Sequence, residues 1–345
     1  MESLGDNAIV YYKTMINPLK IKNRIIDPPL FSAPMAGVSH SAFRRLVANF
    51  GCYGALFTEM LSGKAILHEK IGASPYTKKR PAEGAVWYQL ALMSNDAIPK
   101  IIHRLKAIEP FALDINAACP APEMTRQGYG AALFRNLDSF AKTAAMVRQS
   151  WDGVLTIKCR LGDEDAKWQE KFIERLKIME AEGIDAVIVH PRFFKDKLKR
   201  KARWELFAWI ASETSLPIIA NGDIVSQKQL QDEIDRLAPV SGLMVGRMAV
   251  VKPWFFCELS GKSVTVDYAA AWSTFYSYVL EDFPGEKAIG RIKEFSKYFA
   301  QNFLFGHEFY RIIQSSSNLE SMYANGMRFL QANPKTAMSP TIRGL

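Results

Sequence analysis

Short apolar runs typical of β-strands alternate with longer helix-like segments, and this alternation constrains the fold most strongly. The strand-like runs centre on residues 30–33, 55–58, 86–90, 112–115, 155–158, 186–189, 217–220 and 242–245. The helix-like segments between them include residues 41–49, 98–108, 137–148, 166–182 and 227–237. Alternating strands and helices form a parallel sheet, and eight repeats over roughly 250 residues are the usual length of a closed (β/α)8 barrel.

A doubly wound open sheet is the main competing architecture. It requires a glycine-rich turn after the first strand, followed by a helix and an acidic residue at the end of the next strand. Here the first strand leads instead into Pro34-Met35-Ala36-Gly37. The sequence therefore predicts an α/β protein with a (β/α)8 TIM barrel.

The strand signal stops after about Trp254. Residues 268–280, 288–303 and 309–327 have apolar positions at helical spacing, and Pro284-Gly285 separates the first two segments. We therefore expect a catalytic barrel over residues 1–255, followed by a small all-helical domain over residues 256–345. A chain of 345 residues has room for one large core with such an addition.

The cysteine pattern and the lack of a long apolar run limit the setting of the protein. The four cysteines form no CxxC pair and have no histidine at metal-ligand spacing, so we expect a reducing compartment and no metal site. No apolar run reaches the ~20 residues that cross a bilayer. Residues 1–17 lack the pattern of a signal peptide. We expect a cytoplasmic monomer with no membrane partner.

The net charge of +9 would attract the protein to polyanions. Part of the excess is local, because six Lys and Arg side chains lie within residues 195–203. Such a run is often only a solvated face, so charge alone leaves both interpretations open.

Polar or otherwise unusual residues follow the strands at their C-terminal ends, which is where a barrel carries its chemistry. In strand order they are Pro34 and Met35, Glu59, Gln89, Asn116 and Cys119, Lys158 and Arg160, His190 and Arg192, Asn221-Gly222-Asp223, and Gly246-Arg247.

The last two strand ends indicate a phosphate-bearing ligand. Gly222 and Gly246 would let backbone amides approach a phosphate, and Arg247 adds a charge-assisted contact, although either glycine could be a simple turn residue. Lys158 ends an apolar strand, where an unused cation would be costly. Gln89 and Asn116 carry amides that can bind the edge of a heteroaromatic ring. Together these residues suit flavin mononucleotide (FMN).

Residues from about Leu30 to Phe255 resemble the tRNA-dihydrouridine synthases, a family of FMN-dependent reductases with a barrel and a C-terminal helical domain. The matching motifs include Ala33-Pro34-Met35-Ala36-Gly37, Thr58-Glu59-Met60, Asp114-Ile115-Asn116-Ala117-Ala118-Cys119-Pro120, Lys158-Cys159-Arg160-Leu161-Gly162, Val189-His190-Pro191-Arg192, Ala220-Asn221-Gly222-Asp223-Ile224 and Gly246-Arg247. Three positions depart from the family pattern: Ala118, where glycine is usual; Glu123, where many relatives have lysine; and Pro191, where a small residue is usual.

The resemblance implies reduction of uridine in tRNA to 5,6-dihydrouridine, with NADPH as reductant and Cys119 as proton donor. The positions that match FMN contacts are Pro34, Met35, Ala36, Gln89, Lys158, His190, Asn221, Gly222, Asp223, Gly246 and Arg247. The expected RNA contacts are Asn116, Arg160, Arg192, Lys199, Arg200 and Arg203 in the barrel, with Arg291, Lys293 and Lys297 in the helical domain. Cys52, Cys159 and Cys257 are expected to be small buried hydrophobes, and His40 and His68 receive no role.

This chemistry explains the residue types. Reduced flavin delivers hydride to one carbon of the uracil double bond, and an acid must protonate the neighbouring carbon from the opposite face. A thiol stays mostly protonated near neutral pH and suits that task. Two alternatives remain open at this point: a flavin barrel that reduces a free pyrimidine or small enone, and a non-catalytic RNA-binding protein with a degraded barrel.

Overall fold

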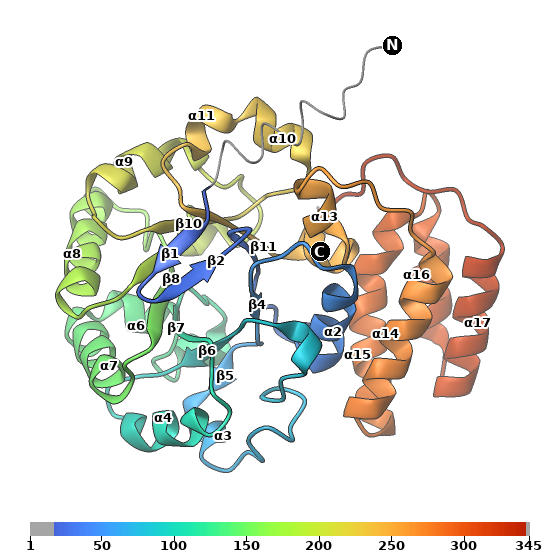
Figure 1. The fold of residues 1–345 in the computed structure, drawn as a ribbon, viewed down its shortest axis with the longest axis horizontal. Coiled ribbons are helices and arrows are strands. Elements are labelled where there is room, and N and C mark those ends of the chain that lie inside the picture. The colour runs from blue at the N-terminus through green and yellow to red at the C-terminus, as the bar shows by residue number, and fades with distance from the viewer. Residues whose placement is uncertain (1–16, 343–345) are drawn as a thin grey trace.

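The computed structural model of the chain describes residues 17–342 and contains the expected barrel (Figure 1). The barrel strands are parallel, and each is hydrogen-bonded to the next in the order β3-β11-β10-β9-β8-β7-β6-β4. A parallel bridge between Phe31 and Ala55 closes the ring between β3 and β4. The barrel strands are β3 (Leu30–Ser32), β4 (Leu56–Phe57), β6 (Val86–Ala91), β7 (Ala112–Ala117), β8 (Val154–Arg160), β9 (Ala186–His190), β10 (Ile218–Asn221) and β11 (Gly242–Val245).

A hairpin and a group of aromatic side chains fill the N-terminal end of the barrel. The hairpin pairs β1 (Leu19–Ile21) with β2 (Arg24–Ile26). Leu19, Ile21 and Ile26 of the hairpin belong to the same buried cluster as three aromatic residues whose ring centroids lie 5.1–6.4 Å apart: Phe31, Phe57 and Trp87. The Lys22 ammonium donates to the carbonyl of Asp152 at 2.9 Å, just before β8 begins. The barrel is therefore packed and closed at this end.

Helices surround the strands with apolar residues turned inward, as in α4, which buries Ile98, Ile101, Ile102 and Leu105. The expected helix over residues 227–237 is divided, because the chain leaves helical geometry at Glu233. The helices of the barrel are α2 (Ser41–Phe50), α3 (Gly63–Ile66), α4 (Ile98–Lys106), α5 (Pro122–Thr125), α6 (Ala131–Arg135), α7 (Leu137–Ser150), α8 (Trp168–Ala181), α9 (Phe207–Ser212), α10 (Gln227–Asp232), α11 (Ile234–Leu237) and α12 (Arg247–Val251).

The chain then continues through α13 (Phe255–Leu259) into a helical bundle beside the barrel, made of α14 (Tyr268–Asp282), α15 (Gly285–Phe299), α16 (Gly306–Ser315) and α17 (Leu319–Gln331) (Figure 1). The prediction of a single helix over residues 309–327 is wrong. The first helix ends at Ser315, and Asn318 caps the start of the next one, because its side chain accepts from the backbone N–H of Ser321 at 2.8 Å. Serine and asparagine favour such capping over a helix interior. The boundary at residue 255 stays a prediction.

The bundle packs on α2 and on the loops after the first two barrel strands. Phe43 of α2 contacts Phe295 of α15, with ring centroids 6.3 Å apart. Arg45 pairs with Glu281 at 2.6 Å. The buried ring of His40 lies against Phe283, with centroids 4.8 Å apart. One apolar cluster runs from the barrel into the bundle, so the two parts share a continuous core.

Within residues 17–342 no helix is long and apolar enough to cross a membrane. No group of three or more His, Cys, Asp or Glu side chains in that part of the chain could hold a metal ion. The expectation about a signal peptide falls on residues 1–17, of which 1–16 lie outside the described residues.

Candidate active site at the mouth of the barrel

A cavity of about 220 Å³ lies at the C-terminal ends of the strands. Leu198 from the basic segment and Ile342 from the C-terminal segment also line this cavity. Of the predicted cofactor residues, Ala36 is exposed and Gln89 is buried in β6, and neither lines it. Those that line the cavity are Pro34, Met35, Lys158, His190, Asn221, Gly222, Asp223, Gly246 and Arg247.

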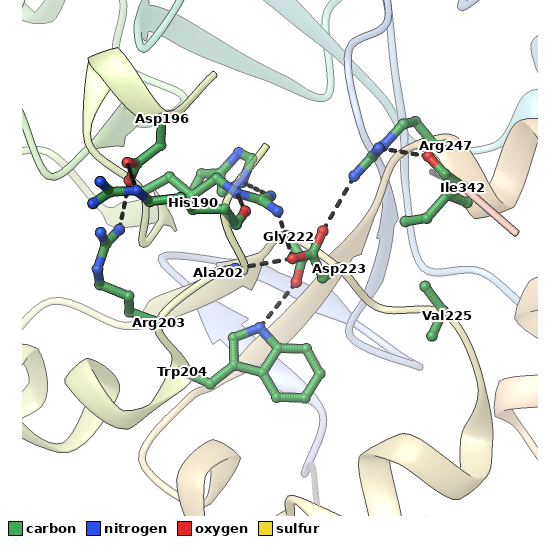
Figure 2. Close-up of polar contacts among 12 residues, drawn as sticks. His190, Asp196, Ala202, Arg203, Trp204, Gly222, Asp223, Val225, Arg247 and Ile342 are labelled. Atoms are coloured by element: carbon green, nitrogen blue, oxygen red, sulfur yellow. Dashed lines mark hydrogen bonds and ion pairs between the residues drawn. The ribbon is translucent and has the colours of Figure 1, made fainter. Parts of the chain in front are cut away.

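A carboxylate between two guanidinium groups organises one side of the cavity (Figure 2). Asp223 pairs with Arg192 at 2.6 Å and with Arg247 at 3.1 Å. Arg247 also donates to the carbonyl of Ile342 at 2.8 Å. Arg192 lies 2.8 Å from Nε2 of His190. Burial, followed by the charges of nearby Arg and Lys side chains, lowers the pKa of His190 well below its ordinary value, so this ring stays neutral.

Only glycine fits at position 222, because of its backbone conformation and because of the side chains around it. Its φ is +116°, and a Cβ atom there would lie 2.8 Å from Cδ2 of His190. Its carbonyl accepts from the Trp204 indole at 2.9 Å (Figure 2). The side chain of the preceding Asn221 donates to the carbonyl of Met244 at 2.8 Å. The backbone after β10 is therefore held against β11 with room for nothing larger than glycine.

Lys158, which lines the cavity, and Asp114 of β7 are a buried cation and a buried carboxylate. Burial, reinforced by the charge of Arg160, lowers the pKa of Lys158 to about 8. Burial raises the pKa of Asp114 to about 7, although two side chains donate to its carboxylate: Thr156 at 2.6 Å and Gln89 at 2.7 Å. Sequence reasoning assigned Asp114 no role of its own. The sequence could have indicated this residue, because an acidic side chain inside an apolar strand must have polar partners.

The loop that carries Cys119 is held from two sides. Oδ1 of Asn116 accepts the backbone N–H of Cys119 at 3.0 Å, while Nδ2 of Asn116 donates to Gln89 at 2.8 Å. On the other side, the N–H of Ala131 donates to the Cys119 carbonyl at 2.9 Å. Gly130, with φ +60°, permits this approach, because a Cβ atom there would lie 2.5 Å from the same carbonyl oxygen. The backbone of Cys119 is therefore held by hydrogen bonds at both its N–H and its carbonyl.

The basic segment 195–203 lies at the rim of the cavity. Some of its basic side chains bind other residues of the protein, and others are exposed. Arg203 turns back onto Asp196 at 2.6 Å and over the ring of Phe193. Arg200 is 59% exposed beside Glu164, and Lys199 is also exposed.

Two other expected RNA contacts in the barrel are directed inward. Arg160 lines the cavity and donates to the carbonyl of Lys197 at 2.8 Å. Arg192 is 2% exposed and is occupied by the bonds given above.

The three basic residues expected to bind RNA from α15 lie in different surroundings. Arg291 bridges the bundle and the barrel, since it donates to the Tyr76 hydroxyl at 2.7 Å and lies 3.7 Å from Glu59. Lys293 donates to the carbonyl of Gln314 at 2.8 Å. Lys297 is partly exposed, with its ammonium 5.7 Å from the centre of the Tyr298 ring.

Solved structures share the fold at low sequence identity. The old yellow enzyme from Trypanosoma cruzi matches with a TM-score of 0.53 and 10% identity, over 79% of this chain and 98% of that one. A 2-naphthoyl-CoA reductase matches with a TM-score of 0.53 and 13% identity, over 70% of this chain and 51% of that one. These similarities support the barrel.

Sequence comparison identifies the family. Residues 31–316 match the family model described as dihydrouridine synthase. A probable tRNA-dihydrouridine synthase of Rhodobacter capsulatus is 31% identical, over 68% of this chain and 72% of its own. The tRNA-dihydrouridine synthase B of Pasteurella multocida is 30% identical over 70% of each chain. The chain therefore belongs to the dihydrouridine synthase family of oxidoreductases.

Proposed function

We propose that this protein reduces uridine in tRNA to 5,6-dihydrouridine, with FMN held in the cavity, NADPH as the reductant and Cys119 as the proton donor. One structural relationship supports the proposal most. Asn116, which holds the backbone of Cys119, pairs directly with Lys158 across the β7–β8 ladder. The proposed acid and the proposed flavin site thus occupy adjacent strand ends, at the end of the barrel where chemistry is expected.

The donors around the cavity fit FMN. Arg247, with the backbone around Gly222 and Gly246, would hold the phosphate, and Lys158 would contact the electron-rich edge of the ring system. The remaining predicted cofactor residues would complete the contacts, including Ala36 and Gln89, which lie outside the cavity lining. The absence of a side chain at Gly222 keeps His190 in place beside this site. When bound, the reduced flavin supplies the hydride.

The chain's own groups supply the rest of the chemistry. The Cys119 thiol gives its proton to the ring carbon next to the one that receives hydride, and Asn116 fixes the thiol's loop during that transfer. Arg160, which lines the cavity, and Asn116 would contact the base. After product leaves, the thiolate recovers a proton from solvent.

The RNA substrate requires further contacts, because turning a stacked base outward costs a few kcal/mol. Lys199 and Arg200 are exposed at the cavity rim and would bind the phosphate backbone. Lys297 of α15 would extend this contact, and Lys293 would do so by exchanging its bond to the Gln314 carbonyl for one to RNA. Arg192, Arg203 and Arg291 would act mainly by holding the surrounding groups, since internal partners already engage them.

Mapping dihydrouridine in tRNA from cells with and without this protein tests the proposal. We expect at least one position to revert to uridine when the protein is absent and to be restored by the purified protein with NADPH. An unchanged dihydrouridine map would refute the proposal. Turnover of a free pyrimidine or small enone without RNA would favour that alternative, and a colourless protein that never binds flavin would favour the non-catalytic one.

A further inference from the structure

We propose that Cys52 and Cys257 form a reversible disulfide site, oxidised by a peroxide, that ties the end of α2 to α13. The two sulfur atoms lie 2.6 Å apart although the residues are 205 positions apart in sequence. Both cysteines are present as thiols in this structure. This inference does not depend on the proposed tRNA reaction, because neither residue lines the cavity at the barrel mouth.

The backbone around Cys52 brings its thiol to α13. Gly51 and Cys52 have φ values of +75° and +63°, so the chain reverses immediately after α2. A non-glycine residue in this region is uncommon, and such a conformation persists only where neighbouring contacts enforce it. The Cys257 thiol lies 3.2 Å from the carbonyl of Phe50, just before this reversal.

Aromatic contacts on both sides hold the two segments together. The rings of Phe50 and Trp254 have centroids 5.7 Å apart, and those of Tyr53 and Phe256 lie 6.2 Å apart. Each pair joins a residue close to Cys52 with a residue close to Cys257. The thiols therefore meet between two fixed contacts, and bond formation needs only a small local movement.

The two sulfur atoms differ in their exposure to solvent. This difference indicates which one reacts first with the oxidant. Cys52 is partly exposed, whereas Cys257 is 4% exposed. Burial, followed by the hydrogen bond to Cys52, raises the pKa of the Cys257 thiol to about 12 and keeps it protonated. Cys52 is thus the sulfur that meets the oxidant, and Cys257 is the resolving thiol.

The reaction balances with hydrogen peroxide as the oxidant. The Cys52 sulfur attacks one peroxide oxygen, the O–O bond breaks, and one water leaves as Cys52 becomes a sulfenic acid. The Cys257 sulfur then attacks the Cys52 sulfur, the S–O bond breaks, and the thiol proton leaves with the hydroxyl group as a second water. Two thiols lose two electrons to one peroxide. A cellular dithiol reductant reverses the step by thiol–disulfide exchange.

Non-reducing peptide mapping of the full chain tests this site. After treatment with hydrogen peroxide and trypsin, we expect residues 46–64 and 248–262 to appear as one linked peptide, two hydrogens lighter than the sum of the two. Dithiothreitol should separate them. The oxidised protein should also unfold about 3–6 °C higher than the reduced protein, because the bond restricts the unfolded chain.

Three variants separate this site from other oxidation. Cys52→Ser and Cys257→Ser should each abolish the linked peptide and the thermal shift, whereas Cys119→Ala should retain both. Cys52→Ser changes a partly exposed side chain, so it remains informative if Cys257→Ser fails to fold. Wild-type protein that oxidises at Cys52 to sulfinic acid without forming the linked peptide would overturn the proposal. A thermal shift that persists in Cys52→Ser would overturn it as well.

Discussion

The Asn116 side chain donates to Oε1 of Gln89 at 2.8 Å, and this bond fixes which way both amides face. The other end of the Gln89 amide donates to Asp114, so the Asn116 oxygen is left to face the Cys119 backbone. Each amide has one donor end and one acceptor end. The Asp114 carboxylate therefore fixes the orientation of the Gln89 amide, which fixes that of Asn116, which in turn holds the backbone of Cys119.

Asn116→Asp tests this chain of amides. The substitution keeps an acceptor for the Cys119 backbone but places a carboxylate oxygen against the Gln89 oxygen. The free energy of unfolding should fall by about 1–3 kcal/mol, with reduced activity, because a buried donor is lost. The matched control is Asn136→Asp, since Asn136 only accepts, from the Ser139 N–H at the start of α7. Urea unfolding should show less than about 0.5 kcal/mol of change in the control. Equal losses in both variants would contradict the assignment.

Cys119→Ala separates proton donation from cofactor binding. Flavin content and flavin reduction should match the wild type, while product formation falls by about 10²–10⁴-fold, the usual contribution of a general acid. Single-turnover assays on tRNA with the pre-reduced enzyme measure this step. Cys159→Ala is the control, because Cys159 is a fully buried thiol on β8. Activity of Cys119→Ala within twofold of this control would remove Cys119 from the mechanism.

Gly222→Ala should displace His190 and weaken flavin binding. The added Cβ atom would lie 2.8–2.9 Å from two atoms of the His190 ring, in a backbone conformation with φ +116°. We expect a lower ratio of flavin absorbance to protein absorbance and a loss of about 1–3 kcal/mol in stability. Gly290→Ala is the control, because its Cβ atom would meet nothing within 4 Å in the interior of α15. That change should stabilise the protein by about 0.5–1 kcal/mol.

His40→Leu should reduce the loss of stability in mild acid. Burial, then the charges of Arg291 and Arg44, lowers the pKa of His40 well below its ordinary value of 6.5. Below pH 6.5 the unfolded chain binds a proton at His40 that the folded protein does not, so this residue costs stability as pH falls. The cost approaches about 1.4 kcal/mol per pH unit.

The measurement for His40 is urea unfolding at pH 7, 6 and 5, compared between variant and wild type at each pH. His190 contributes in the same direction, and Asp114, with its raised pKa, in the opposite one, so the absolute curve is not diagnostic. The advantage of His40→Leu over wild type should grow as pH falls. His68→Leu, at an exposed position, should run parallel to wild type. Parallel behaviour of His40→Leu would contradict this prediction.

The double variant Lys199→Ala with Arg200→Ala should weaken tRNA binding at the cavity rim. The salt dependence of log K should become shallower by about 1.4–1.8, because two phosphate contacts are lost. Lys20→Ala is a control for general charge, since Lys20 is exposed on the hairpin at the opposite end of the barrel. Filter binding from 50 to 200 mM salt distinguishes them. A slope unchanged from wild type would place the RNA elsewhere.

Sequence reasoning found the barrel because its evidence is local and repeated. Each strand is a short apolar run, and strand ends carry polar groups that a packed core would not keep. The same reasoning missed the break at residues 316–318, because the apolar residues on both sides keep helical spacing through the Ser-rich stretch. It also missed the hairpin of residues 19–26, whose two strands are only three residues long.

Contacts between residues far apart in the sequence could not be predicted, for a different reason. The pairing of Cys52 with Cys257 depends on how α13 returns to the end of α2, which no local pattern encodes. Likewise, the engagement of Arg291 by Tyr76 and Glu59 depends on how the bundle docks. Charge and spacing marked Arg291 as a surface residue of its helix, but the tertiary packing determines what that surface meets.

Within the described residues, the hairpin and the rings of Phe31, Phe57 and Trp87 close the N-terminal end of the barrel, and the cavity opens at the opposite end. The reductant and the RNA of the proposed reaction would then approach the same face of the molecule. Under the proposed function, the nicotinamide dinucleotide must depart before the base is swung in. Each turnover would then use this opening twice, first for the reductant and then for the RNA base, and FMN would supply the electron transfer between them.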